Sequence, residues 1–156
     1  MKKTNAMRIL DSNKLSYEIK EYSKEDGTSG VEVAKTLNED PNTVYKTLVT
    51  FSKNENYVFV IPAPAELDLK KAAIAAGEKK IEMLSQKELL PKTGYIHGGC
   101  SPVGMKKLFK TFIDSSAENQ EYIYVSGGKV GMQVKLNPKE LAELIGAEFI
   151  NVVKGE

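Results

Sequence analysis

Two neighbouring stretches rich in β-branched and aromatic residues constrain the fold more than any other part of this 156-residue chain. They are Val44–Phe51 and Tyr57–Ile61, and the turn-forming residues Ser52–Asn56 lie between them. Residues of these types favour extended strands, and a short polar segment between two such runs favours a hairpin. The sequence therefore predicts an antiparallel β-hairpin, with the cation Lys46 near the start of a mostly apolar first strand.

Helix and strand signals alternate along the rest of the chain. Period-two alternation predicts a strand from Leu15 to Tyr22, which places Tyr22 at the strand exit. Capping residues, glycines and β-rich runs predict helices at 5–12, 29–37, 68–76, 85–90 and 137–145, and strands at 80–83, 111–114, 122–126, 132–136 and 149–153. About seven strands and five short helices, without a repeat or linker, predict one mixed α/β (α+β) domain over residues 1–156.

Composition excludes several classes of protein. The net charge is +1, so no global positive field would hold the chain on nucleic acid. One Cys and one His exclude an internal disulfide and a Cys/His zinc cluster, and we expect neither a cofactor nor a metal. No run of about 18 apolar residues occurs, which predicts a cytoplasmic protein, and we expect a monomer.

The stretch Thr93–Gly104 gathers four of the twelve glycines with the only His and the only Cys. Glycine allows a ligand to approach main-chain groups, and Pro102 fixes the end of the loop. The stretch is thus either the rigid wall of a small pocket or a structural turn. A nucleophilic dyad of His97 and Cys100 is disfavoured, because their spacing in an extended loop points the two side chains apart. Cys100 is better explained as a small buried residue of the pocket wall.

Two groups of lysines could contact phosphates or simply face solvent. One group follows the glycine-rich stretch and the other lies near the predicted helix at 68–76; the members are Lys106, Lys107 and Lys110, and Lys70, Lys71, Lys79 and Lys80. Because no paired carboxylates are apparent either, nothing in the sequence indicates a nucleophile supplied by the protein.

Three motifs together resemble those of a known family. They are Val44–Leu48, Gly94–Gly104 and Tyr124–Lys129, and Leu67–Lys71 lies between the first two. In this order and spacing, the chain closely resembles the YbaK/EbsC family of free-standing aminoacyl-tRNA deacylases over nearly its whole length. That resemblance implies a mixed β-sheet, partly closed into a barrel and flanked by helices, related to the editing domain of prolyl-tRNA synthetase.

The resemblance also implies a set of site residues. Lys46 would anchor the substrate, with Thr47 beside it and Tyr22 near the aminoacyl group. The loop from Gly98 to Pro102 would hold the aminoacyl ester beside the 3′ adenosine through its main chain. Implied catalytic residues are Lys46, Gly98 and Gly99, and implied substrate-binding residues are Tyr22, Thr47, Cys100, Ser101, Pro102 and Gln133. Gln133 stands where some relatives have an Asp, and Cys100 where many have an aliphatic residue.

The activity implied by the resemblance is removal of cysteine from Cys-tRNA(Pro), and also from Cys-tRNA(Cys). The substrate's own thiol would attack its ester and leave as a thiolactone. The expected partners are the 3′ end of the tRNA and prolyl-tRNA synthetase. Two alternatives stay open: a deacylase that removes another small residue such as alanine through a bound water, and a non-catalytic module that binds tRNA or a synthetase. The role of His97, structural or acid–base, also stays open.

Overall fold

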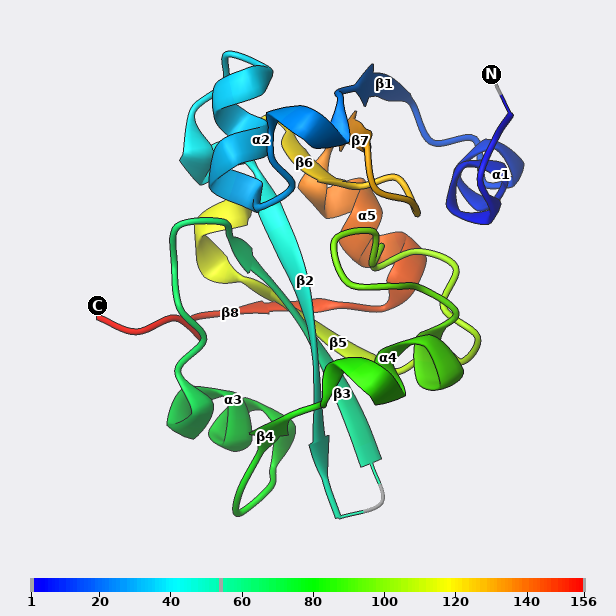
Figure 1. The fold of residues 1–156 in the computed structure, drawn as a ribbon. Coiled ribbons are helices and arrows are strands. Elements are labelled where there is room, and N and C mark those ends of the chain that lie inside the picture. The colour runs from blue at the N-terminus through cyan, green and yellow to red at the C-terminus, as the bar shows by residue number, and fades with distance from the viewer. Residues whose placement is uncertain (1, 54, 156) are drawn as a thin grey trace.

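The computed structural model describes residues 2–53 and 55–155, and within them the strands form two sheets (Figure 1). The five-stranded sheet has the order β4-β2-β3-β5-β8, and the three-stranded sheet has the order β1-β7-β6. The strands are β1 Tyr17–Glu21, β2 Tyr45–Ser52, β3 Glu55–Pro62, β4 Glu82–Met83, β5 Lys110–Asp114, β6 Ile123–Ser126, β7 Met132–Leu136 and β8 Glu148–Ile150. The predicted mixed α+β fold is confirmed, but these strands form two open sheets instead of a partly closed barrel.

The predicted hairpin is confirmed as β2 and β3, which pair antiparallel without interruption from Tyr45↔Pro62 to Ser52↔Glu55. Both strands extend further into the predicted turn than expected. Side chains support this extension, because the Asn56 Nδ2 donates to the Thr50 carbonyl oxygen at 3.1 Å. Asn54, predicted as a turn residue, lies outside the described residues.

The hairpin separates two hydrophobic cores. Successive residues of a strand point to opposite faces of the sheet. Val58 and Val60 accordingly pack into the core that includes the three-stranded sheet, α1 and α5, whereas Phe59 and Ile61 pack into a second core with α3. Figure 1 shows the hairpin running between these two regions, with α3 and β4 at one end and β1, β6 and β7 at the other.

Capping residues define most of the helices as predicted. The helices are α1 Asn5–Ser12, α2 Gly30–Thr36, α3 Leu69–Ala76, α4 Gln86–Thr93 and α5 Pro138–Ile145. Thr4, Asp68 and Asn137 cap α1, α3 and α5, and the capping box of Ser29 and Glu32 forms at α2. Since each cap satisfies main-chain N–H groups of the first turn, these helix starts are set by local sequence. No helix within the described ranges is long and apolar enough to cross a membrane.

The prediction for α4 was wrong in two respects. The capping box expected at Ser85 does not form, because its side chain accepts no main-chain hydrogen bond. The helix also continues past Pro91 to Thr93. Its last turn is held instead by the Thr93 hydroxyl, which donates to the Leu89 carbonyl (2.7 Å), and by the Gly94 N–H, which donates to the Leu90 carbonyl (2.9 Å). The glycine-rich stretch follows directly after this turn.

The last predicted strand is also shorter than expected, ending at Ile150. Beyond it, the Val152 N–H donates to the buried carboxylate of Asp114 (3.1 Å), which also accepts from the Ser116 N–H (3.2 Å). The Asp114 side chain thus takes the place of the next main-chain hydrogen bond between β5 and β8.

Replacing Asp114 by Ala should destabilise the fold, because two main-chain N–H groups lose a charged acceptor. We expect the Asp114→Ala variant to lose about 2–4 kcal/mol of unfolding free energy, measured by urea denaturation. The matched control is Asp40→Ala, since the Asp40 carboxylate caps an exposed N–H of Asn42. That variant should lose about 1 kcal/mol or less. Equal losses in both variants would contradict the prediction.

Candidate active site

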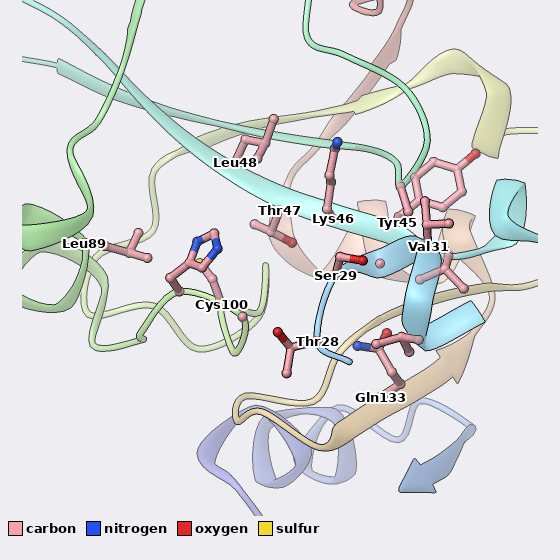
Figure 2. A pocket seen from close by; sticks show the side chains of 16 residues that line it. Thr28, Ser29, Val31, Tyr45, Lys46, Thr47, Leu48, Leu89, Cys100 and Gln133 are labelled. Atoms are coloured by element: carbon pink, nitrogen blue, oxygen red, sulfur yellow. The ribbon is translucent and has the colours of Figure 1, made fainter. Parts of the chain in front are cut away.

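A cavity of about 260 Å³ lies beside the first half of β2 (Figure 2). Its walls come from the segment leading into α2, from β2 itself, from the glycine-rich loop and from β7. The lining residues are Thr28, Ser29, Gly30, Val31, Val33, Val44, Tyr45, Lys46, Thr47, Leu48, Ala63, Leu89, His97, Gly98, Cys100 and Gln133. Segments far apart in sequence therefore meet around β2.

Strand β2 presents both of its faces to this cavity. Lys46 and Leu48 project from one face, and Thr47 from the other, as alternation requires. Figure 2 shows Lys46 and Leu48 on one side of the ribbon, with Cys100 and Gln133 beyond the other side. Burial lowers the pKa of the Lys46 ammonium from 10.5, while the carboxylate of Glu66 opposes this shift. The ammonium is therefore a partly desolvated cation at one side of the cavity.

The glycine-rich loop is held closed by its own side chains. The buried Tyr95 hydroxyl donates to the Val103 carbonyl (2.5 Å), and the Val103 N–H donates to the Ser101 hydroxyl (3.1 Å). Gly98 has φ +87°, in the left-handed region that L side chains rarely adopt. A Cβ on Gly99 would lie 3.0 Å from the Lys129 Cα, so the loop packs against that turn. The wall is rigid because it is fixed from both inside and outside.

Cys100 lies in the wall with 8% of its surface exposed. Burial raises the pKa of its thiol to about 12, which keeps the thiol protonated near neutral pH. Since the thiolate is the nucleophilic form, Cys100 is unsuited to covalent catalysis. Its position agrees with the prediction of a small buried residue in the pocket wall.

Three buried polar side-chain atoms have no hydrogen-bond partner within the described residues: the Tyr22 hydroxyl, the Thr47 Oγ1 and the Gln133 Oε1. Thr47 and Gln133 line the cavity. Gln133 is only 6% exposed, so leaving its carbonyl oxygen unpaired costs free energy that a bound donor would recover. The two unpaired oxygens of Thr47 and Gln133 mark the part of the cavity that is suited to a polar ligand.

The structure gathers five of the nine predicted site residues around the cavity: Lys46, Thr47, Gly98, Cys100 and Gln133. The other four lie outside its lining. Gly99 packs on the Lys129 turn, and the hydroxyl of Ser101 binds main chain within the loop. Pro102 lines a separate apolar cavity beside α1 and α5. Tyr22 follows β1 as predicted and is tied to Gly131 through its N–H (2.9 Å), but its side chain is not part of the lining.

The wall before α2, made by Thr28 and Ser29 and continued by Val31 in the first turn of the helix, was not predicted from the sequence. Gly30 brings this wall close, because a Cβ at that position would lie 2.4 Å from the Ala63 Cβ. A glycine at the first position of a helix was the available signal, but it specified no partner. His97 also lines the cavity, from an exposed position on the loop.

The chemistry of the lining is limited. Among the described lining residues there is no Asp or Glu, and the basic side chains are Lys46 and His97. Across residues 2–53 and 55–155, no group of three or more His, Cys, Asp or Glu is placed to hold a metal ion. The cavity can therefore bind a polar ligand and stabilise negative charge, but its described side chains supply no carboxylate base and no thiolate.

The fold and the cavity define a small mixed α+β domain with a candidate ligand-binding site between a glycine-rich loop and a lysine-bearing strand. The model of the aminoacyl-tRNA editing domain family matches residues 24–144. The chain is 45% identical to EbsC of Enterococcus faecalis, a candidate Cys-tRNA(Pro)/Cys-tRNA(Cys) deacylase, over 99% of this chain and 95% of EbsC. The chain therefore belongs to the aminoacyl-tRNA editing domain family, and the resemblance to YbaK/EbsC proteins is confirmed.

Solved structures agree on the fold. A candidate trans-editing enzyme for prolyl-tRNA synthetase has a TM-score of 0.86 at 23% identity, with 99% of this chain and 100% of that chain covered. The protein APE2540 has a TM-score of 0.89 at 22% identity, with 97% and 100% covered. At these identities the two structures establish the shared architecture.

If the unpaired hydroxyl of Thr47 serves a ligand, its removal should not cost stability. We expect Thr47→Val to leave the free energy of unfolding unchanged or to raise it by up to about 1 kcal/mol, because a buried unsatisfied group is removed. The matched control lies on the same strand: the Thr50 hydroxyl donates to the Tyr57 carbonyl (2.9 Å). Thr50→Val should lose about 1 kcal/mol. Urea denaturation measures both, and a loss at position 47 as large as that at position 50 would contradict this expectation.

Burial of the Cys100 thiol predicts a dependence of stability on pH. Its pKa is 9.0 in the unfolded reference and about 12 in the folded protein. The stabilising contribution is complete below pH 9 and is lost as pH rises toward 12, by at most about 1.4 kcal/mol per pH unit. Urea denaturation between pH 8 and 11 should show a shallower decline for Cys100→Ala than for the wild type. Parallel curves, or rapid alkylation of the native thiol at pH 8, would refute the assignment.

Proposed function

We propose that this protein is an aminoacyl-tRNA deacylase that removes cysteine from Cys-tRNA(Pro), and also from Cys-tRNA(Cys), after release from the synthetase. The observation that carries the proposal is a cavity with an ammonium, unpaired polar oxygens and a glycine loop, but with no carboxylate or thiolate among its described lining residues. Family membership and 45% identity to EbsC support the same reaction class.

The substrate supplies the missing nucleophile in this proposal. The cysteine thiol gives its proton to solvent, and its sulfur forms a bond to the ester carbonyl carbon. The bond between that carbon and the ribose oxygen then breaks, and the ribose oxygen takes up a proton. The products are a thiolactone of cysteine and uncharged tRNA. The protein accelerates this step by holding thiol and ester together and by stabilising the oxygen that gains negative charge.

We assign the main electrostatic role to Lys46. Its ammonium is partly desolvated, so its field on a nearby oxyanion or phosphate is less screened than at an open surface. The positions of Tyr22, Gly99, Ser101 and Pro102 suit a supporting role, in which they fix the walls of the cavity. Cys100 and Gln133 would contact the aminoacyl group.

A second candidate is hydrolysis of another small ester, such as that of Ala-tRNA(Pro), by a bound water. The unpaired Thr47 Oγ1 and Gln133 Oε1 favour it, because two buried oxygens could hold and orient a water molecule. The two reactions differ in their need for a thiol on the substrate.

The decisive assay compares release of amino acid from Cys-tRNA(Pro), S-methylcysteinyl-tRNA(Pro) and Ala-tRNA(Pro). We expect release from the first substrate only, because methylation blocks the sulfur and alanine has none. We also expect Lys46→Ala to lower the rate at least about a hundredfold, as removal of an oxyanion-stabilising group does. Lys139→Ala, a change at an exposed position of α5, is the control and should keep the wild-type rate.

The other outcomes separate the alternatives. Release of S-methylcysteine or alanine at the rate of cysteine would establish the water-dependent reaction. Absence of release from every substrate, with tRNA binding retained, would identify a non-catalytic module.

We also propose that prolyl-tRNA synthetase assists the reaction. The net charge of +1 gives little attraction to a polyanion. We expect synthetase to raise the deacylation rate at low enzyme concentration and the dependence on salt to be weak. An undiminished rate without synthetase would argue against this partner.

A further inference from the structure

The outer edge of β2 is paired over only part of its length. Strand β4 pairs with Thr50 and Phe51, and the Leu84 N–H just beyond β4 donates to the Val49 carbonyl (3.0 Å). At the start of the strand, Val44 forms a bridge with Tyr124 of β6, and Thr47, between this bridge and β4, borders the cavity. A sheet edge that ends inside a cavity offers main-chain donors and acceptors to a ligand.

Two hydrogen bonds on opposite sides of β2 fix the direction of its main chain. On the β3 side, the Ala63 N–H donates to the Val44 carbonyl (2.7 Å), and on the outer side Leu84 bonds to Val49. The pairing with β3 has no bulge, so the alternation between sides is uninterrupted. Thr47 lies two residues before Val49, and its N–H and C=O therefore point outward, into the cavity.

These Thr47 groups are available. In the described parts of the chain, no strand pairs with Thr47 on the outer side and no loop hydrogen bond reaches its main chain. Its buried Oγ1 is also without a partner. Gly98 and Cys100 form the facing wall, so the space between them and β2 is bounded by main chain on both sides.

We propose that the main chain of Thr47 binds the aminoacyl group of the substrate as if it were one residue of an added strand. The α-ammonium donates to the Thr47 carbonyl, and the Thr47 N–H donates to the ester carbonyl oxygen. These two bonds form the ring that joins a hydrogen-bonded pair of residues in an antiparallel ladder. The inference rests on the proposed function, because it takes an α-aminoacyl ester as the ligand.

This pairing also orients the side chain of the substrate. Directly paired residues place their side chains on the same face of a sheet. Thr47 shares its face with Tyr45 and Val49, whose core cluster includes Cys100. The side chain of an L-amino acid then lies toward Cys100, whereas that of a D-amino acid would lie toward Lys46. The main chain of Thr47 would recognise the α-aminoacyl unit, and the side chains of the cavity would recognise the side chain of the substrate amino acid.

The carbonyl oxygen of the ester gains negative charge when the thiol sulfur attacks the carbonyl carbon. A main-chain N–H already bonded to that oxygen stabilises the charge without reorganisation. Thr47 would thus act on both binding and rate through a group that no side-chain substitution removes.

A stable substrate analogue tests this assignment without turnover. The probe is 3′-deoxy-3′-(L-2-aminobutyryl)aminoadenosine, which has an amide in place of the ester and lacks a thiol. Replacing the peptide bond between Lys46 and Thr47 by an ester removes the Thr47 N–H and keeps every side chain. We expect titration calorimetry to show about tenfold weaker binding of the probe, the effect of one hydrogen bond to a ligand. The butyryl analogue without the amine and the D-2-aminobutyryl analogue should each bind the wild type at least about tenfold more weakly.

The control is an ester between Thr50 and Phe51, where the removed N–H faces β4. It should bind the probe like the wild type. If the ester at Thr47 prevents folding, hydrogen exchange in the wild type replaces it, and the Thr47 amide should become protected when the probe binds.

Wild-type affinity in the Thr47 ester variant, or unchanged exchange at Thr47, would overturn the inference. Deacylation of Cys-tRNA(Pro) by the same preparation would show that the proposed function survives that result. Conversely, Thr47-dependent binding of the probe without deacylation would uphold the inference and reject the proposed reaction.

Discussion

The one-sided pairing of β2 is the constraint on which the rest of the structure depends. The strand pairs with β3 along its whole length, but its outer edge is paired only at Thr50 and Phe51, by β4, and just before its start, where Val44 bridges to Tyr124 of β6. An open strand edge at a free surface promotes association with other strands. Here the edge is enclosed by the wall before α2 and by the glycine loop, so it is kept from other chains while small ligands can reach it.

The enclosing walls in turn depend on close packing at two glycines. At Gly30, a side chain would collide with Ala63 and push the first wall away from β2. At Gly99, a side chain would meet the main chain of Lys129 and displace the loop. The Tyr95 hydroxyl, buried and bonded to Val103, fixes the loop from inside. The cavity is therefore formed before any ligand binds, and little ordering cost is left for binding.

Local signals made much of the fold predictable. Thr4, Asp68 and Asn137 specify helix starts through hydrogen bonds within three residues, and the hairpin follows from residue type alone. The shortened β8 was not predictable from local patterns, because Asp114 binds the Val152 N–H across 38 residues of sequence. The end of α4 was missed although its bonds are local, because a proline usually ends a helix and here the Thr93 hydroxyl holds the turn that follows Pro91.

The site residues likewise separate into those that the sequence indicates and those that depend on tertiary packing. Lys46, Thr47, Gly98, Cys100 and Gln133 were identified through family motifs, and they line the cavity. Residue types could not separate lining positions from supporting ones. Whether a glycine faces the ligand or a neighbouring turn depends on tertiary packing. The wall before α2 was missed because its capping box has a sufficient local explanation, and its second role arises only from contact with Ala63.

A cavity without its own nucleophile has a consequence for fidelity, given the proposed function. Cysteine and proline are similar in size, and an apolar pocket separates ligands that differ by one methylene by only about 10- to 200-fold. If the attacking atom comes from the substrate, correctly charged prolyl-tRNA is spared because proline has no thiol, however well it fits. The high pKa of Cys100 then acquires a functional meaning, since a reactive thiolate in the wall could attack any bound ester. Selectivity would then arise because the ligand, and not the cavity, supplies the nucleophile. The protein holds main-chain and side-chain dipoles in place around the ligand.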